Sequence, residues 1–211
     1  MMAISYRIME KKDYNRVKEL IIQAWFSEYP FKKKIIRLYA KAYLYSYLAE
    51  ANFQRVACDG DKVCGFIFGR YKKAKKLKAL HYNFKLFWIL FRMLFSKAGR
   101  RGLKIAYRTE KANAKLMKPF KKQLKNELVL FIVDDAYHGQ GIGSSLEKSF
   151  IEFLNHRNAD NVYLYTDTYS NFHFYEHRSY ERFAELEVDF GIDGEDEDGL
   201  PVYYLYAKKL K

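Results

Sequence analysis

The residues best suited to chemistry stand in one short stretch, His138-Gly139-Gln140-Gly141-Ile142-Gly143-Ser144. Glycines at alternate positions let the backbone bend sharply and approach a ligand closely. The unpaired N–H groups at the start of the helix that we expect over 144–155 would converge on one spot and attract an anion. The stretch therefore predicts a cradle for a phosphate or pyrophosphate, with a purely structural glycine turn as the alternative.

Two common nucleotide-binding motifs are excluded by the spacing. A Walker loop requires a lysine and then a serine or threonine after its last glycine, but Ser144 follows Gly143 directly. The dinucleotide fingerprint requires G-x-G-x-x-G, whereas Ser144 stands three positions beyond Gly141 and Leu146 three beyond Gly143. Both of these nucleotide-binding interpretations therefore fail on spacing.

A second stretch of chemically active residues follows about thirty positions later. His173, Glu176 and His177 fit H-x-x-E-H, the zinc-binding pattern of one group of metalloproteases. Such a site needs a third protein ligand and a long supporting helix, and this segment is short and bounded by serines. We therefore expect no metal there.

Together the two stretches resemble the signatures of the GNAT superfamily of acetyl-CoA-dependent N-acetyltransferases. The glycine stretch is similar to the family's Q/R-x-x-G-x-G/A, with His138 at the glutamine or arginine position. The strand before it resembles the family strand whose exposed backbone pairs with pantetheine. The resemblance implies acetyl-CoA as co-substrate, bound by Phe131, Ile132, Val133, His138, Gly139, Gln140, Gly141, Ile142, Gly143, Ser144 and Asn171.

The second stretch is similar to the family's Asn…Phe-Tyr-Glu-x-x-Gly-Phe, with Ser179 in place of the glycine and Tyr180 in place of the phenylalanine. The resemblance implies that Tyr175 protonates the departing CoA thiolate. An amine acceptor must lose a proton before it attacks, so a general base is useful. Glu127, at the head of the central strand, is the catalytic base that we expect, and Asp167, at the end of the next strand, is a second candidate.

The implied reaction is transfer of an acetyl group to a primary amine of a small molecule or peptide, by direct attack in a ternary complex. The family places its acceptor pocket among the first two helices, which here contain Trp25, Phe26, Tyr29 and Phe31. Aromatic rings suit a cationic guest, although core packing is the commoner reason for them. The competing hypothesis is a non-catalytic protein that binds acetyl-CoA, or RNA or a membrane.

The pattern along the chain predicts which elements position these residues. Alternation and turn signals predict strands at 5–9, 53–58, 62–70, 128–133, 161–168, 183–190 and 202–208, and helices at 13–25, 35–47, 79–95, 144–155 and 171–177. Asp59-Gly60 predicts a hairpin between the second and third strands. The order predicts an α/β fold of the α+β type: a single GNAT-like domain over 1–211, with a mixed central sheet flanked by helices.

The net charge of +13 is concentrated in residues 72–125, which carry eighteen Lys and Arg and one acid, Glu110. We expect this segment to be a partly helical insertion between the third and fourth strands. Its predicted helix over 79–95 would carry Lys85 and Arg92 on one stripe and aromatic residues opposite. The insertion could be a lid with its aromatic face inward, a helix on an anionic membrane, a contact for RNA or an acidic polypeptide, or a solvated extension.

Two cysteines, Cys58 and Cys64, are too few for a disulfide framework and favour a reducing compartment. The first residues lack the basic and apolar regions of a signal peptide, and the most apolar run, Leu86 to Phe91, is too short to cross a bilayer. We therefore expect a cytoplasmic protein. The oligomeric state is open, with a dimer among the alternatives.

Overall fold

The computed structural model describes residues 3–26, 32–73, 79–190 and 200–210 of the 211-residue chain. The strands are β1 (Ile4–Ile8), β2 (Phe53–Asp59), β3 (Lys62–Arg70), β4 (Glu127–Val133), β5 (Asn161–Asp167), β6 (Glu181–Glu187) and β7 (Val202–Lys209). The helices are α1 (Tyr14–Phe26), α2 (Lys33–Glu50), α3 (Ala79–Met93), α4 (Lys97–Met117), α5 (Ile142–Asn155) and α6 (His173–Glu176), with 3-10 turns η1 (Lys11–Asp13), η2 (Lys118–Phe120) and η3 (Asp135–Tyr137). The predicted α/β domain with a mixed sheet is confirmed.

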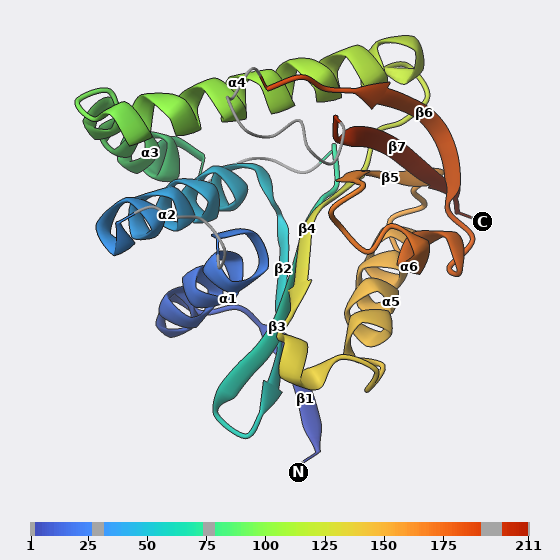
Figure 1. Cartoon of the computed structure of the whole chain (residues 1–211). Helices are drawn as coiled ribbons and strands as arrows, with labels where there is room; N and C mark the ends of the chain where they lie inside the picture. The colour runs from blue at the N-terminus through green and yellow to red at the C-terminus, as the bar shows by residue number, and fades with distance from the viewer. Residues whose placement is uncertain (1–2, 27–31, 74–78, 191–199, 211) are drawn as a thin grey trace.

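The seven strands form one sheet in the order β1-β2-β3-β4-β5-β7-β6, and only the β4–β5 pair is parallel (Figure 1). The predicted hairpin joins β2 to β3, and Gly60 adopts the left-handed φ of +59° that its turn requires. Every other neighbouring pair is antiparallel. The one parallel junction lies in the middle of the sheet, where the two halves of the fold meet.

β4 and β5 separate almost as soon as they meet. Their ladder contains the single pair Glu127–Tyr163, supported by a hydrogen bond from the Tyr163 N–H to the Asn126 carbonyl (2.8 Å). On its other edge β4 pairs with β3 up to Val133. Beyond Glu127, therefore, the edge of β4 that faces β5 has no strand ladder within the described residues. Backbone groups on such an edge need other partners, and an extended ligand can supply them.

Helices cover both faces of the sheet (Figure 1). On one face, α1 and α2 pack fully buried side chains such as Leu20 and Leu44 against Phe66 of β3. On the other face, α5 packs against β2, β3 and β4, with Leu146 and Phe150 in the core. Both sides of the central strands are thus buried, so β4 and its flanking helices form a rigid support for the residues around them.

In its described part, the insertion between β3 and β4 contains α3, α4 and the 3-10 turn η2. The predicted helix over 79–95 is confirmed as α3, whereas α4, whose first turn is capped by the Ser96 hydroxyl accepting from the Gly99 N–H (3.0 Å), was not predicted. α4 crosses the molecule in contact with α2, α3, β6 and β7 (Figure 1). No helix in the described part of the chain has both the length and the apolar character required to cross a bilayer.

Candidate active site

The glycine stretch is a tight turn that carries the chain from β4 through η3 into α5. Gly139 and Gly141 have φ of +76° and +75°, and a Cβ on either would meet no atom within 4 Å. Their backbone therefore borders open space, as a ligand cradle requires. At Gly143 a Cβ would lie 2.8 Å from Cζ of Phe131, so the glycine lets the helix start close to β4.

The predicted cofactor residues divide into those that present backbone and those that present side chains. Ile142 is buried in the core, so only its main chain can reach a ligand, while Gln140 is exposed and Ser144 is partly exposed. The His138 ring lies 3.1 Å from the Val133 carbonyl oxygen and so fastens the turn back to β4. Cofactor contact by His138 and by the exposed Asn171 stays a prediction.

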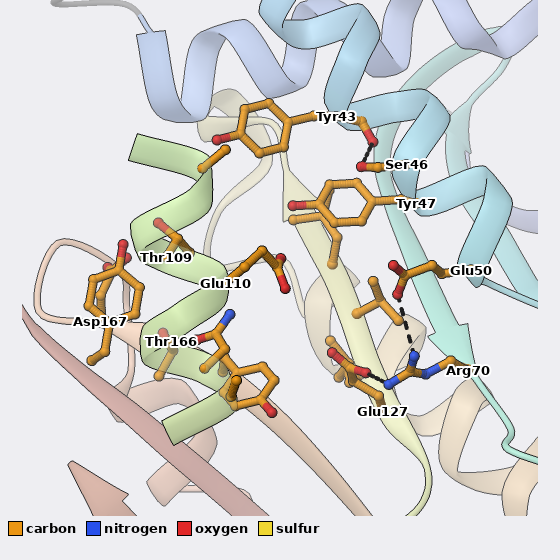
Figure 2. Close-up of a pocket in the computed structure, with 18 of the residues that line it drawn as sticks. Tyr43, Ser46, Tyr47, Glu50, Arg70, Thr109, Glu110, Glu127, Thr166 and Asp167 are labelled. Carbon is orange, nitrogen blue, oxygen red and sulfur yellow. Dashed lines mark hydrogen bonds and ion pairs between the residues drawn. The ribbon is translucent and has the colours of Figure 1, made fainter. Parts of the chain in front are cut away.

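A cavity of about 1600 Å³ opens between β4, β5, α2 and α4 (Figure 2). Its walls include both candidate bases, Glu127 and Asp167, and the candidate acid, Tyr175. Trp25 and Phe26 also line it, as predicted, whereas Tyr29 and Phe31 lie outside the described residues. The structure therefore brings the predicted catalytic side chains to one cavity. The glycine turn lies outside it, beyond the carboxyl end of β4.

Next to Tyr175, hydrogen bonds join α5 to the residues that follow α6. The buried Glu147 of α5 accepts hydrogen bonds from Arg178 (2.8 and 2.6 Å) and from the Tyr180 hydroxyl (3.1 Å). The Tyr175 ring packs edge-on against Tyr180 with centroids 5.7 Å apart. Within the described ranges its hydroxyl makes no hydrogen bond to another residue, and burial raises its pKa, so the phenol stays protonated at neutral pH.

Ser179 adopts the backbone conformation of the glycine that it replaces in the family motif. Ser179 has φ of +61°, the left-handed conformation that suits the glycine found in the family motif. The serine accepts this conformation at a cost of about 1–2 kcal/mol. The turn that follows Tyr175 is therefore preserved despite the replacement.

The H-x-x-E-H residues belong to a network of hydrogen bonds. His173 Nδ1 lies 2.9 Å from Glu176, whose other oxygen accepts from Tyr206 (2.6 Å) and Arg182 (3.0 Å). Hydrogen bonds from Tyr206 and His173 lower the pKa of Glu176 to about 2, which makes it a poor base. In the described ranges no group of three or more His, Cys, Asp or Glu side chains is arranged to hold a metal.

Glu127 is a buried carboxylate within an ionic network at the cavity wall. It forms an ion pair with Arg70 and accepts a hydrogen bond from the Tyr163 hydroxyl (3.0 Å). Arg70 also lies 3.4 Å from Glu50 of α2. Burial raises the pKa of Glu127 to about 6, so at neutral pH it is ionised yet basic enough to take a proton.

Sequence reasoning missed a second group of acids in the cavity. Glu110 projects from α4 toward α2, where Glu50 also faces the cavity (Figure 2). Partial burial and the neighbouring Glu50 carboxylate raise the pKa of Glu110. One signal was available: Glu110 is the only acid among residues 72–125.

Comparison with known proteins identifies the family. The model of the Acetyltransferase (GNAT) family matches residues 14–183, which include the glycine turn and Tyr175. The chain belongs to the GNAT acetyltransferase family. As a GNAT enzyme it uses acetyl-CoA, and the open edge of β4 and the glycine turn suit that co-substrate. No curated protein matches the sequence.

Solved structures share the fold at low sequence identity. A protein from Pyrococcus horikoshii OT3 is 17% identical with a TM-score of 0.63, covering 99% of both chains. The ribosomal-protein-S18-alanine N-acetyltransferase of Escherichia coli is 14% identical with a TM-score of 0.53, covering 99% of this chain and 95% of its own. The Drosophila melanogaster polyamine N-acetyltransferase is 12% identical with a TM-score of 0.57, covering 99% and 100%. These likenesses concern the fold.

The first prediction concerns the glycine turn: Gly141→Ala should weaken acetyl-CoA binding at least tenfold. Alanine at φ +75° is strained by about 1–2 kcal/mol, and its methyl group enters the open space beside the turn. Isothermal titration with acetyl-CoA measures the loss. Gly60→Ala is the matched control, because it introduces similar strain at φ +59° in the distant β2–β3 hairpin. Equal affinity for the two variants would contradict the cradle.

Proposed function

We propose that this GNAT enzyme transfers the acetyl group of acetyl-CoA to a primary amine of a small molecule or peptide by direct attack. The observation that carries the proposal is the single cavity that contains Glu127 and Tyr175 beside the open edge of β4. Acetyl-CoA would lie along that edge with its phosphates at the glycine turn. The amine would then approach from the side of the cavity between α2 and α4.

The residues divide the proton transfers between them. Glu127 accepts the proton that the acceptor ammonium must lose, and the free amine forms a bond to the thioester carbon. A main-chain N–H of β4 near Val133 donates to the carbonyl oxygen as negative charge develops there. The C–S bond then breaks, and Tyr175 donates its phenolic proton to the departing sulfur. The second proton that the nitrogen loses as it becomes an amide restores the Tyr175 phenol, and Glu127 releases its proton to solvent. No covalent enzyme intermediate is required.

The part of the cavity between α2 and α4 favours an acceptor with a second positive charge. The basic residues of the lining, Arg70, Lys72, Lys118, Lys121 and Lys125, lie outside α2 and α4. Glu50, Glu110 and Asp167 add carboxylates to the cavity wall, and Tyr43 and Tyr47 add stacked rings with centroids 6.0 Å apart. Carboxylates and aromatic faces both bind ammonium groups. Structural neighbours of this chain include a polyamine N-acetyltransferase and an agmatine N-acetyltransferase, which supports a cationic acceptor.

The insertion contributes to this proposal as a wall of the acceptor site. The side of α4 that lines the cavity carries small or polar residues such as Gly102, Ala106, Thr109 and Asn113 beside the apolar Leu103, Ile105 and Met117. α3 contributes Leu86, Leu90 and Met93, while its aromatic residues are exposed on the opposite side. Of the four alternatives for the insertion, a lid with its aromatic face inward does not match this arrangement, because α4 lines the cavity and the aromatic residues Phe84, Phe87 and Phe91 are exposed.

A screen for CoA release tests the function. It compares monoamines, diamines, amino acids, aminoglycosides and peptide N termini, and we expect a diaminoalkane to exceed the monoamine of equal length about tenfold in kcat/KM. Thermal stabilisation by acetyl-CoA without CoA release from any amine would instead indicate a non-catalytic binding protein.

The second prediction concerns Glu110. Glu110→Gln should raise KM for the best diamine about tenfold and leave KM for the matched monoamine unchanged, because the lost charge pairs only with the second ammonium. Steady-state kinetics with both amines measures the difference. Glu152→Gln on α5 is the matched control, since Glu152 is exposed outside the cavity. Equal effects on both amines would refute a separate subsite for the second charge.

A further inference from the structure

α3 has apolar side chains on two opposite faces. Tyr82, Ile89 and Met93 are buried. The other face, which we call the aromatic face of α3, extends through the first residues after the helix. It is formed by Leu80, Phe84, Phe87, Trp88, Phe91, Leu94 and Phe95, each between 42% and 83% exposed. Their spacing of three and four residues places them on one continuous stripe.

The aromatic face is contiguous as well as exposed. Phe87 stacks on Phe91 with centroids 6.4 Å apart, and Phe91 lies edge-on to both Trp88 (5.9 Å) and Phe95 (5.0 Å). Scattered apolar residues on a surface need no explanation, but a joined patch of this size marks a surface that binds something. The acetyl-transfer chemistry uses none of these seven side chains.

The surrounding helices supply positive charge and almost no negative charge. α2 carries Lys33, Lys34, Arg37 and Lys41, all exposed. Arg92, Lys97 and Arg100 are exposed around the end of the aromatic face, and the Arg100 guanidinium donates to the Leu94 carbonyl (2.9 Å). α2, α3 and α4 contain only two acids, Glu50 and Glu110, and both face the acceptor cavity.

We propose that the aromatic face of α3 docks into the interface of an anionic lipid bilayer. α3 would lie parallel to the membrane plane, with its aromatic rings among the acyl chains and the basic residues of α2, α3 and α4 at the anionic headgroups. A helix with an apolar stripe that includes Trp and Phe, bordered by Lys and Arg, is suited to this position. The protein would lie on the membrane without crossing it.

Anionic lipid fits these observations better than RNA or a protein. RNA contacts combine basic side chains with separate aromatic rings that stack on bases, whereas here the apolar side chains form one uninterrupted stripe. The interface between two proteins is depleted of lysine, whereas α2 and α4 place exposed lysines, among them Lys33, Lys34 and Lys97, around this stripe. An anionic bilayer offers acyl chains for the apolar stripe and negative headgroups for the basic residues around it.

Vesicle binding by the full-length chain tests the proposal. We expect at least tenfold stronger cosedimentation with vesicles of 30% phosphatidylglycerol in phosphatidylcholine than with phosphatidylcholine alone, and weaker binding at high salt. The chain has two tryptophans, so in a Trp25→Phe variant the emission comes from Trp88. That emission should shift to the blue when anionic vesicles are added, because Trp88 enters an apolar environment.

The double variant F87E/F91E should lose vesicle binding at least tenfold while it keeps its melting temperature and its CoA-release activity. Ile8→Glu is the matched control, because Ile8 is 70% exposed on β1, away from the insertion. The proposal fails if Trp88 emission is unchanged by anionic vesicles. It also fails if F87E/F91E alters only RNA binding or the oligomeric state. Vesicle binding and Trp88 emission require no acetyl transfer, so either proposal can fail without the other.

Discussion

Tyr175→Phe should lower kcat about a hundredfold and change KM for acetyl-CoA by less than about twofold. A positioned general acid contributes on the order of 10²–10⁴ to the rate, and the phenylalanine ring cannot protonate the departing thiolate. The fold should be unaffected, because the ring can keep its packing against Tyr180 and Tyr206. The lost hydroxyl makes no hydrogen bond to another described residue.

Steady-state CoA release over a range of acetyl-CoA concentrations separates kcat from KM. Tyr169→Phe is the matched control, since Tyr169 lines the same cavity but is 71% exposed. A donor thioester whose thiol is more acidic should partly restore the Tyr175→Phe variant, because its leaving group needs less protonation. An unchanged kcat for this variant would remove Tyr175 from the role of acid.

Glu127→Gln should lower kcat at pH 7.5 about a hundredfold and abolish a rise in kcat near pH 6. Burial raises the pKa of Glu127 to about 6, so the carboxyl group is protonated and inactive as a base below that pH, and ionised above it. Wild-type kcat at saturating acceptor should therefore increase through pH 6. Glutamine keeps the shape of the side chain, and Arg70 keeps Glu50 as an ionic partner.

Asp167→Asn is the comparison that assigns the base. Oδ1 of Asp167 accepts from the Tyr169 N–H (3.1 Å) and the Ser170 hydroxyl (2.8 Å), and an asparagine oxygen can accept the same bonds. We expect this variant to retain the rise in kcat near pH 6. If Asp167→Asn loses the rise and Glu127→Gln keeps it, the role passes to Asp167.

Much of the acetyl-CoA side of the site could be predicted, because the sequence motifs that indicate it are local. The glycine turn lies within seven consecutive residues, and the Asp59-Gly60 pair defines its hairpin within two. The Tyr175 motif is equally compact, and even the replacement of its glycine by Ser179 leaves the backbone conformation in place. Short-range backbone preferences decide such features, and the sequence displays those preferences directly.

The cavity proposed for the amine could not be predicted in the same way, because its contacts join residues that lie far apart in the sequence. Glu127 meets Arg70 across 57 positions, and no spacing rule relates them. α4 was missed because small residues such as Gly102 and Ala106 replace the large apolar side chains that usually reveal a helix. The orientation of α3 stayed open between several alternatives, because a helix with two apolar faces gives no sign of which one is buried.

The division of the site between separate stretches of chain has an evolutionary consequence. The open edge of β4 and the glycine turn come from one stretch, whereas α4, which closes the cavity, belongs to an insertion whose chain connects to β3 and β4 and which packs on β6 and β7. Substitutions in the insertion can therefore change which amine is accepted without disturbing the acetyl-donor side. A lineage could acquire new acceptors by varying residues 72–125, and an engineer could exchange the same segment as a cassette.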